Sequence, residues 1–354
     1  MQTNNAKPAI TSSQRALYYW LLTGCLLIFL MVVIGGITRL TGSGLSITDW
    51  KIVTGTLPPL TDSQWQQEFM SYQQTPQYKL VNAHFTLTDF KGIYWWEYLH
   101  RLIGRLIGLV FIIPFIIFYK RKWVSSKLLP HLVVIFLMGG FQGFLGWYMV
   151  KSGLLSQPSV SHIRLAMHLL NALLTFAYTY WVACMVKFEN AKHANTWPIA
   201  KGWIYALMFF LLFQITYGAF VAGLKAGLVY NTWPKMDGMW MAESIPFAFS
   251  KTGVSSLIYN LASVQFIHRI CAVLLFLTVV FIWIKSMGKQ LDAGLQNAIN
   301  VLLLSVFIQF VLGVLTLIFQ VPLVLAVLHQ AGAFVLLGTA IHVWYLLKMG
   351  AKQN

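Results

Sequence analysis

A short motif occurs twice in this chain, as Glu97-Tyr98-Leu99-His100-Arg101 and again as Gln265-Phe266-Ile267-His268-Arg269. Each copy lies at the start of an apolar segment, and the second apolar segment after each copy contains another histidine, His168 or His329. Histidine and arginine are costly inside a bilayer and usually mark a functional site there. The repeat therefore predicts a duplicated membrane protein with one pair of histidines in each copy.

The composition is that of a membrane protein and not of a soluble domain. Of the 354 residues, 58% are hydrophobic and 10% are charged, and the mean hydropathy is +0.68. Apolar stretches of about 20 residues recur, long enough to cross ~30 Å of hydrocarbon as helices. Eight are predicted, at 17–37, 95–118, 131–150, 163–186, 203–223, 263–284, 298–320 and 323–347.

The net charge of +16 is distributed as membrane orientation requires, and not as in a nucleic-acid-binding protein. Lysine and arginine gather in alternate loops, between residues 1 and 16, 119 and 128, 187 and 202, 284 and 290, and near the C-terminus. Most acidic residues lie in the other loops. We expect a bacterial inner-membrane protein with both termini in the cytoplasm, lipid around its surface and no nucleic-acid partner.

The two halves align beyond the opening motif. Residues 44–50 resemble residues 227–233, and Gln142 with its nearby Leu-Gly pair resembles Gln309 with its own. Each unit contains four predicted spans, an even number, so the second unit enters the membrane in the same orientation as the first.

The expected fold is all-α, with two tandem four-helix bundles related by a pseudo-two-fold axis along the membrane normal. The N-terminal unit is placed at residues 1–190 and the C-terminal unit at 191–354. The long external loops, 41–94 and 224–262, are too long to be simple connections and are expected to form a packed cap.

The four histidines of the repeat are expected at one depth. His100, His168, His268 and His329 each lie about six residues inside a predicted span, or ~10 Å below the external boundary at 1.5 Å per residue. Two facing histidines in a helical bundle are typical of haem ligation, whereas zinc and non-haem iron sites need more ligands. The alternative is that these histidines only pack against neighbouring backbone.

Arginines accompany the histidines at the external ends of the spans, at positions 101, 105, 164 and 269. Arginine pairs well with carboxylates in a low dielectric, so Arg101, Arg105, Arg164 and Arg269 are candidates to bind haem propionates. The alternative is that they extend to the lipid headgroups.

The most informative difference between the copies is Glu97 against Gln265. A carboxylate inside a span costs free energy unless it is paired or hydrated, and glutamine cannot accept a proton. The difference suggests proton chemistry in the N-terminal unit and only cofactor binding in the C-terminal unit. Alternatively, Glu97 pairs with Arg101 or Arg105.

Several further stretches complete a resemblance. Residues 35–46, Pro58-Pro59, the Phe90-Lys91 pair before the first motif, and residues 231–236 all resemble the haem A synthase family, and the similarity covers almost the whole chain. The cysteines, at positions 25, 184 and 271, all lie in predicted spans. No cysteine pair lies in the external loops, so the chain is similar to the family branch that lacks such a pair, found in proteobacteria and mitochondria.

The resemblance implies oxidation of a methyl group of haem o to a formyl group, giving haem a, through two successive hydroxylations. It implies that His100 and His168 bind the substrate haem o and that His268 and His329 bind haem b, the expected electron relay. Glu97 matches the essential carboxylate. A haem o synthase and an electron donor are the implied partners, and oligomerisation stays open.

Two questions remain open at this point. A quinol-linked dihaem cytochrome b, or a haem carrier without catalysis, would also explain four histidines. In addition, if His100 and His168 both ligate the substrate iron, oxygen has no coordination position. Either one ligand leaves, or oxidation occurs away from the iron.

Overall fold

The computed structural model describes residues 11–50, 54–155, 157–189 and 197–350, and within these ranges it contains helices and no strands. Eight of its helices are long and apolar enough to cross a membrane, so all eight predicted spans are confirmed and the chain is a multi-pass membrane protein. They are α1 (Ser12–Leu40), α4 (Leu87–Lys120), α5 (Leu129–Leu155), α6 (His162–Lys187), α7 (Pro198–Gly223), α10 (Leu261–Ser286), α11 (Ala293–Ile318) and α12 (Leu323–Gly350).

Some helices extend beyond their apolar segments. Helix α4 begins at Leu87, not at the predicted residue 95, because Thr86 and Asp89 form a reciprocal capping box at its start. Hydropathy detects the part of a helix that faces lipid, while the capping residues determine where the helix begins. The extra turns of α4 precede the first histidine motif and pack against the first loop.

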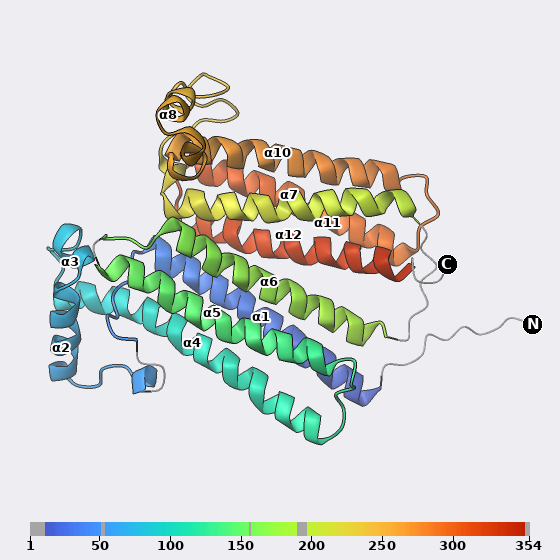
Figure 1. Ribbon diagram of the computed structural model, residues 1–354, viewed down its shortest axis with the longest axis horizontal. Helices are drawn as coiled ribbons and strands as arrows, with labels where there is room; N and C mark the ends of the chain where they lie inside the picture. Colours follow the sequence, from blue (N-terminus) through green and yellow to red (C-terminus); the bar gives the residue numbers. More distant parts are fainter. Residues whose placement is uncertain (1–10, 51–53, 156, 190–196, 351–354) are drawn as a thin grey trace, which may run out of the picture.

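The long helices form two groups (Figure 1). Helix α1 packs on α4 and α6, and α5 packs on α6; in the other group α7 packs on α10, and α11 packs on α10 and α12. The groups meet where α1 and α6 contact α12 and where α6 contacts α7. The predicted boundary between residues 190 and 191 lies outside the described residues, and the pseudo-two-fold relation stays a prediction.

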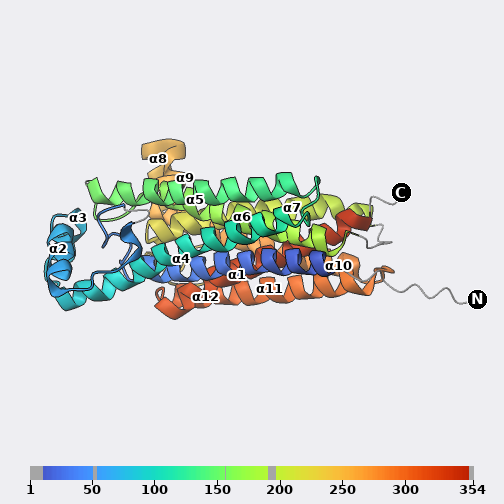
Figure 2. The ribbon, with the colours of Figure 1, turned by 90° about the horizontal axis from the view of Figure 1, so that it is seen from below.

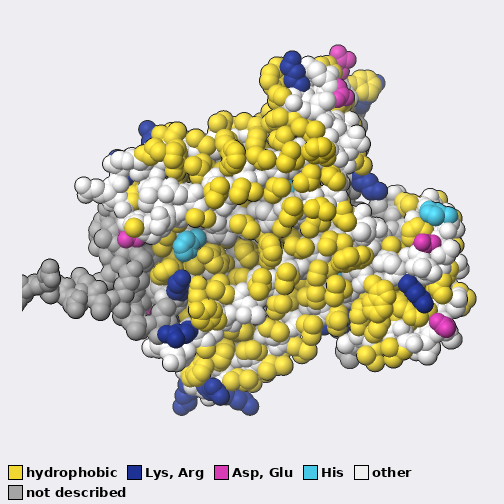
Figure 3. All heavy atoms as spheres, turned by 180° about the vertical axis from the view of Figure 1, so that it is seen from behind, with side chains coloured by type: hydrophobic (Ala, Val, Ile, Leu, Met, Phe, Trp, Pro, Cys, Tyr) yellow, Lys and Arg dark blue, Asp and Glu magenta, His cyan; other side chains and the backbone are white. Residues whose placement is uncertain are grey.

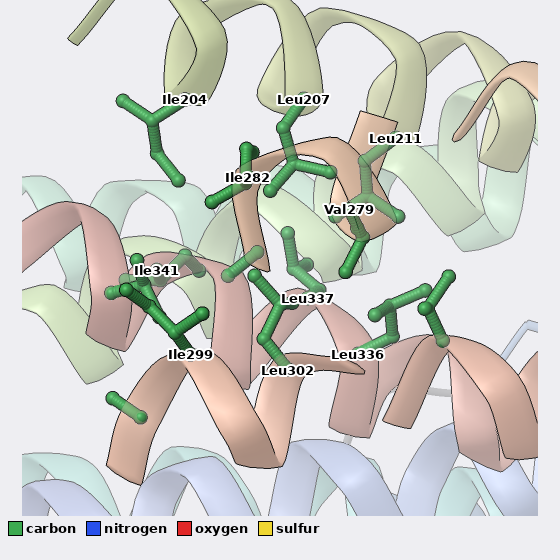
Figure 4. Close-up of a cluster of buried hydrophobic side chains, with 14 of the residues drawn as sticks. Ile204, Leu207, Leu211, Val279, Ile282, Ile299, Leu302, Leu336, Leu337 and Ile341 are labelled. Atoms are coloured by element: carbon green, nitrogen blue, oxygen red, sulfur yellow. The ribbon is translucent and has the colours of Figure 1, made fainter. Parts of the chain in front are cut away.

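The interior between α7, α10, α11 and α12 is filled by aliphatic side chains (Figure 4). In lipid there is no hydrophobic gain from bringing apolar helices together, so close packing has to hold them. The side chains in this cluster that are almost fully buried include Ile204, Leu207, Leu211, Val279, Ile299, Leu302 and Leu336.

The surface matches a bilayer environment. A broad hydrophobic band covers the helices in the face shown in Figure 3, and most charged side chains lie at its edges or on the loop regions beyond it. Exposed leucine, isoleucine and phenylalanine side chains on every membrane helix contribute to this band.

Both external loops are folded, as expected for a cap. The first contains η1 (Thr54–Thr56), α2 (Asp62–Gln73) and α3 (Pro76–Leu80), and its aromatic cluster packs against the extra turns of α4. The second contains η2 (Ala226–Leu228), α8 (Ser244–Thr252), η3 (Gly253–Ser255) and α9 (Ser256–Tyr259). Both lie at the end of the bundle opposite the start of α1 (Figures 1 and 2).

Candidate functional site

One cavity of about 1280 Å³ runs between the helices of both groups. His100, His168, His268 and His329 all line it, together with Glu97. Its walls are mostly apolar. The structure therefore brings the predicted histidines together in one continuous space, which exceeds the size of an ordinary small-molecule pocket.

Each histidine faces a glycine on the membrane helix that precedes its own. A Cβ atom added to these glycines would lie within 2.8 to 3.2 Å of the Cε1 atom of the facing histidine. Such distances are tighter than ordinary contacts, so the glycines make room for the rings. The pairs are Gly35 with His100, Gly146 with His168, Gly218 with His268, and Gly313 with His329.

A glutamine precedes three of these glycines by one helical turn, and its side-chain amide nitrogen lies beside the facing histidine. The distances from Nε2 to a ring nitrogen are 3.2 Å for Gln142 and His168, 3.3 Å for Gln214 and His268, and 3.2 Å for Gln309 and His329. Such contacts orient an imidazole ring, as outer partners of metal-bound histidines do. The corresponding position on α1 is Met31.

The two histidines of the C-terminal group suit a shared metal ion. The ring centroids of His268 and His329 are 6.5 Å apart, which lets both rings reach one ion at the ~2 Å of a metal–imidazole bond. Nδ1 of His268 is buried without a hydrogen-bond partner, as is Nδ1 of His100. Among the described residues no group of three or more His, Cys, Asp and Glu could hold a metal. Two facing histidines are a ligand set that a haem iron accepts.

Glu97 is almost fully buried, with 3% of its surface exposed. Its Oε2 accepts hydrogen bonds from the backbone nitrogens of Ser46 and Ile47, at 2.7 and 2.9 Å, and from the Ser46 hydroxyl, at 2.8 Å. Its Oε1 is paired with the Arg101 guanidinium at 2.6 Å. The alternative in which Glu97 pairs with Arg101 is therefore observed, and the carboxylate also anchors the first external loop.

Arg101 and Arg269 hold the loops in the same manner. Arg101 donates to the carbonyl oxygens of Ile47 and Asp49, at 2.8 Å each. Arg269 donates to those of Tyr230 and Thr232, at 2.6 and 2.9 Å. These arginines line the cavity. Arg101 uses its donors on the loop and on Glu97, and Arg269 uses both terminal nitrogens on its loop while its Nε is buried without a partner.

The other predicted residues differ in position. Arg105 lines the cavity. The guanidinium of Arg164 lies over the Tyr148 ring, 3.8 Å from its centroid, and donates to the Tyr148 carbonyl, and Arg164 is not among the cavity-lining residues. His342, on α12, contacts the Tyr180 hydroxyl through Nδ1 at 3.2 Å. The cysteines are buried and free.

Sequence reasoning noted Gln142 and Gln309 only as landmarks of the repeat and Gly35 only as part of residues 35–46, and it missed Gln214 and Gly218. The available signal was a glutamine four residues before a glycine, once on each of α5, α7 and α11. Comparing single helices, and not only whole halves, would have revealed it.

Comparisons with known proteins match most of the length of this chain. The family described as "Cytochrome oxidase assembly protein" (COX15-CtaA) matches residues 18–341. A protein of Flavobacterium johnsoniae is 48% identical over 91% of this chain and 95% of its own. One of Parvibaculum lavamentivorans is 43% identical over 98% of this chain and 97% of its own. Both relatives carry the name "Heme A synthase".

Proposed function

The chain belongs to the COX15-CtaA family of cytochrome oxidase assembly proteins, and from this membership we propose how its two pairs of histidines perform the conversion of haem o to haem a. That conversion is an oxidoreductase reaction. A ring methyl group becomes a formyl group through two hydroxylations, and the resulting geminal diol loses water. With dioxygen as the oxidant, each hydroxylation inserts one oxygen atom into a C–H bond of the methyl group and reduces the other to water, which consumes two electrons and two protons.

His268 and His329 are the proposed ligands of a resident haem b. The 6.5 Å separation of their rings, the unpartnered Nδ1 of His268 and the amides of Gln214 and Gln309 beside the rings support this assignment. Haem b bound there would supply electron transfer. The protein contributes the ligands, their orientation and the exclusion of water from a mostly apolar space.

His100 and His168 are the proposed ligands of the substrate haem o. They line the same cavity as the C-terminal pair and face glycines in the same way. Arg105 also lines this part of the cavity and is the proposed propionate partner. Arg101, with most of its donors bound to the loop and to Glu97, positions the loop over the substrate.

A short connection joins the two sites. Gln330 follows His329 in the chain and donates from Nε2 to the Val32 carbonyl of α1 at 2.8 Å. A Cβ atom on Gly36 would lie 3.0 Å from the Gln330 side chain, while the adjacent Gly35 faces His100. This contact between the helices supports a relay of electrons from the C-terminal haem site to the N-terminal one.

Glu97 is proposed to act in the reaction from its place in the loop network. Both of its oxygens accept hydrogen bonds, so its first task is to fix residues 46 and 47 at the cavity. Of the hydrogen-bond partners of Glu97 named above, the Ser46 side chain is the one that bears a hydroxyl group. A proton that reaches or leaves Glu97 within this network therefore moves through Ser46 Oγ.

The proposed location is the bacterial inner membrane, with both termini in the cytoplasm. Arg15 at the start of α1, and Lys120, Lys187, Lys285 and Lys348 in the last turns of helices, all lie at the end of the bundle away from the folded loops. Positive residues stay on the cytoplasmic side. Haem o synthase and an electron donor are the proposed partners.

The direct test is to express the chain in a host that makes haem o but no haem a, and to separate the extracted haems by chromatography. Haem a should accumulate. A dihaem cytochrome b or a haem carrier would instead leave haem o unchanged. If the purified protein contains haem at both sites and no haem a is formed, the proposal is wrong.

A further inference from the structure

The four histidines are not held alike, and the exception lies in the proposed substrate site. We propose that His100 is the ligand that detaches from the substrate iron during turnover, and that Met31 and Gly104 are the residues that allow its ring to move. His168 stays fixed by Gln142. This inference rests on the proposed function, and it addresses how a bis-histidine site can admit a reactant.

The first observation is the residue beside each ring. Gln142, Gln214 and Gln309 each place an amide nitrogen 3.2 to 3.3 Å from a ring nitrogen of the facing histidine. At the same position relative to Gly35, α1 carries Met31. A thioether donates no hydrogen bond and accepts only weakly. Nδ1 of His100 is buried without a partner, as is Nδ1 of His268, but Nε2 of His268 has the Gln214 amide beside it.

The fixed partner of the pair is held by more than one bond. The amide nitrogen of Gln142 also donates to the His168 carbonyl at 3.1 Å, and its oxygen accepts from Asn171 at 2.7 Å. The Gln142 side chain is therefore held at both ends. Rotation of the His168 ring would break a contact that the surrounding residues maintain, whereas rotation of the His100 ring breaks none of that kind.

The second observation is the residue one helical turn after each histidine. It is alanine in three cases, namely Ala172, Ala272 and Ala333, and glycine only after His100. All four of these positions line the cavity. A Cβ atom on Gly104 would lie 3.6 Å from the Met31 methyl carbon, so the missing side chain leaves space between α4 and a flexible methionine, which adapts its shape readily.

The backbone around His100 stays in place while its ring moves. Glu97 and Arg101, on the same helix, are bound to residues 46, 47 and 49 of the first loop. Movement is therefore confined to the side chain of His100, toward Met31 and Gly104. The departure of His100 opens one face of the substrate iron while His168 keeps the substrate bound.

Carbon monoxide is a suitable probe, because it binds ferrous haem only where an axial position can open. The protein should be purified with haem at both sites, reduced with dithionite, and titrated with carbon monoxide. We compare Met31→Gln, which supplies the missing amide, with Met31→Leu, which does not, and with Gln142→Met, which frees the other ring.

The expected result is binding to one haem of the native protein, weakened about fivefold in Met31→Gln, the factor expected from one added hydrogen bond, and little changed in Met31→Leu. Gln142→Met should bind at least as well as the native protein. Equal binding by Met31→Gln and the native protein, or a stronger increase in Gln142→Met than any loss in Met31→Gln, would overturn the proposal.

A second variant covers the case in which Met31→Gln does not fold or loses haem. Gly104→Ala introduces the alanine that the other three helices have at this position. It should also weaken carbon monoxide binding. Unchanged binding would count against the proposal. The proposed function fails separately, by the absence of haem a from the native protein. A native protein that makes haem a but shows no effect of either variant refutes only the role of His100.

Discussion

The two external loops are held by corresponding residues, which makes the one difference between them easy to interpret. Arg101 donates to the carbonyls of Ile47 and Asp49, and Arg269 donates to those of Tyr230 and Thr232. When residues 44–50 are aligned with residues 227–233, Ile47 matches Tyr230 and Asp49 matches Thr232. Each guanidinium also lies near the tryptophan that ends the matched stretch, at 4.8 and 5.9 Å from its ring centroid.

The difference is the direction of the hydrogen bonds at Glu97 and Gln265. Glu97 accepts from the backbone N–H groups of Ser46 and Ile47, whereas Gln265 donates to the Tyr230 carbonyl at 3.0 Å. At this position the first loop is therefore held by a buried carboxylate and the second by a neutral amide. The carboxylate for which the sequence repeat predicts proton chemistry is also a structural part of the cap.

The largest expected effect is that of Glu97→Gln, which gives the first loop the residue of the second. The amide cannot accept at all the positions that the carboxylate fills and leaves Arg101 without its charge partner. Haem a production should fall about 100-fold, or ~3 kcal/mol, while the haem of the C-terminal site is retained. Haem extraction and visible spectra measure both quantities.

Ser46→Ala is the variant that separates the two roles of Glu97. It removes the hydroxyl and keeps the backbone N–H, so a positioning role predicts a small loss and a proton path predicts a loss close to that of Glu97→Gln. Gln265→Ala is the matched change in the other loop and should have a smaller effect. Full haem a production by Glu97→Gln would remove the distinction between the loops.

The next effect concerns the glycines that face the histidines. Gly313→Ala would place a Cβ atom 2.8 Å from the His329 ring, and overpacking of this kind costs ~1–3 kcal/mol. The haem-to-protein ratio of the purified variant should fall. Gly202→Ala, on α7, meets no atom within 4 Å and serves as the control. Equal haem content in both variants would show that the rings tolerate displacement.

A smaller effect is expected at the contact between the two sites. Gly36→Ala would press on the Gln330 amide, at 3.0 to 3.2 Å, and shift the residue next to His329. Electron transfer between the haem sites should slow several-fold, with haem content unchanged, as measured by stopped-flow reduction. Gly24→Ala, on the same helix, meets only an ordinary contact at 3.9 Å and should behave as the native protein does.

The smallest effect is expected from the cysteines. Cys25, Cys184 and Cys271 are buried and free, and all three lie within membrane helices. Single replacements by alanine should leave haem a production within about twofold of that of the native protein, because buried cysteines of this kind act as small apolar residues. A strong loss in a variant that still binds haem would reveal a thiol function in one of the halves.

Much of the fold could be predicted because membrane spans depend on local composition. Eight apolar segments were sufficient to place eight helices, since any chain that crosses a bilayer must satisfy its backbone hydrogen bonds internally. Their ends were less predictable. The start of α4 depends on the Thr86 cap and on aromatic packing in the first loop, neither of which hydropathy records.

The sequence by itself determined the helical class, the family, and the histidines and the acidic residue of the candidate site, because repeated polar residues in apolar segments are costly and stand out. Only the tertiary structure decided what each of them touches. The pairing of Glu97 with the loop, the placement of Arg164 on Tyr148, and the contact of the Gln142 amide with the His168 ring all depend on how separate helices and loops pack together. Such contacts follow from the packing of whole helices, which no single segment of the sequence encodes.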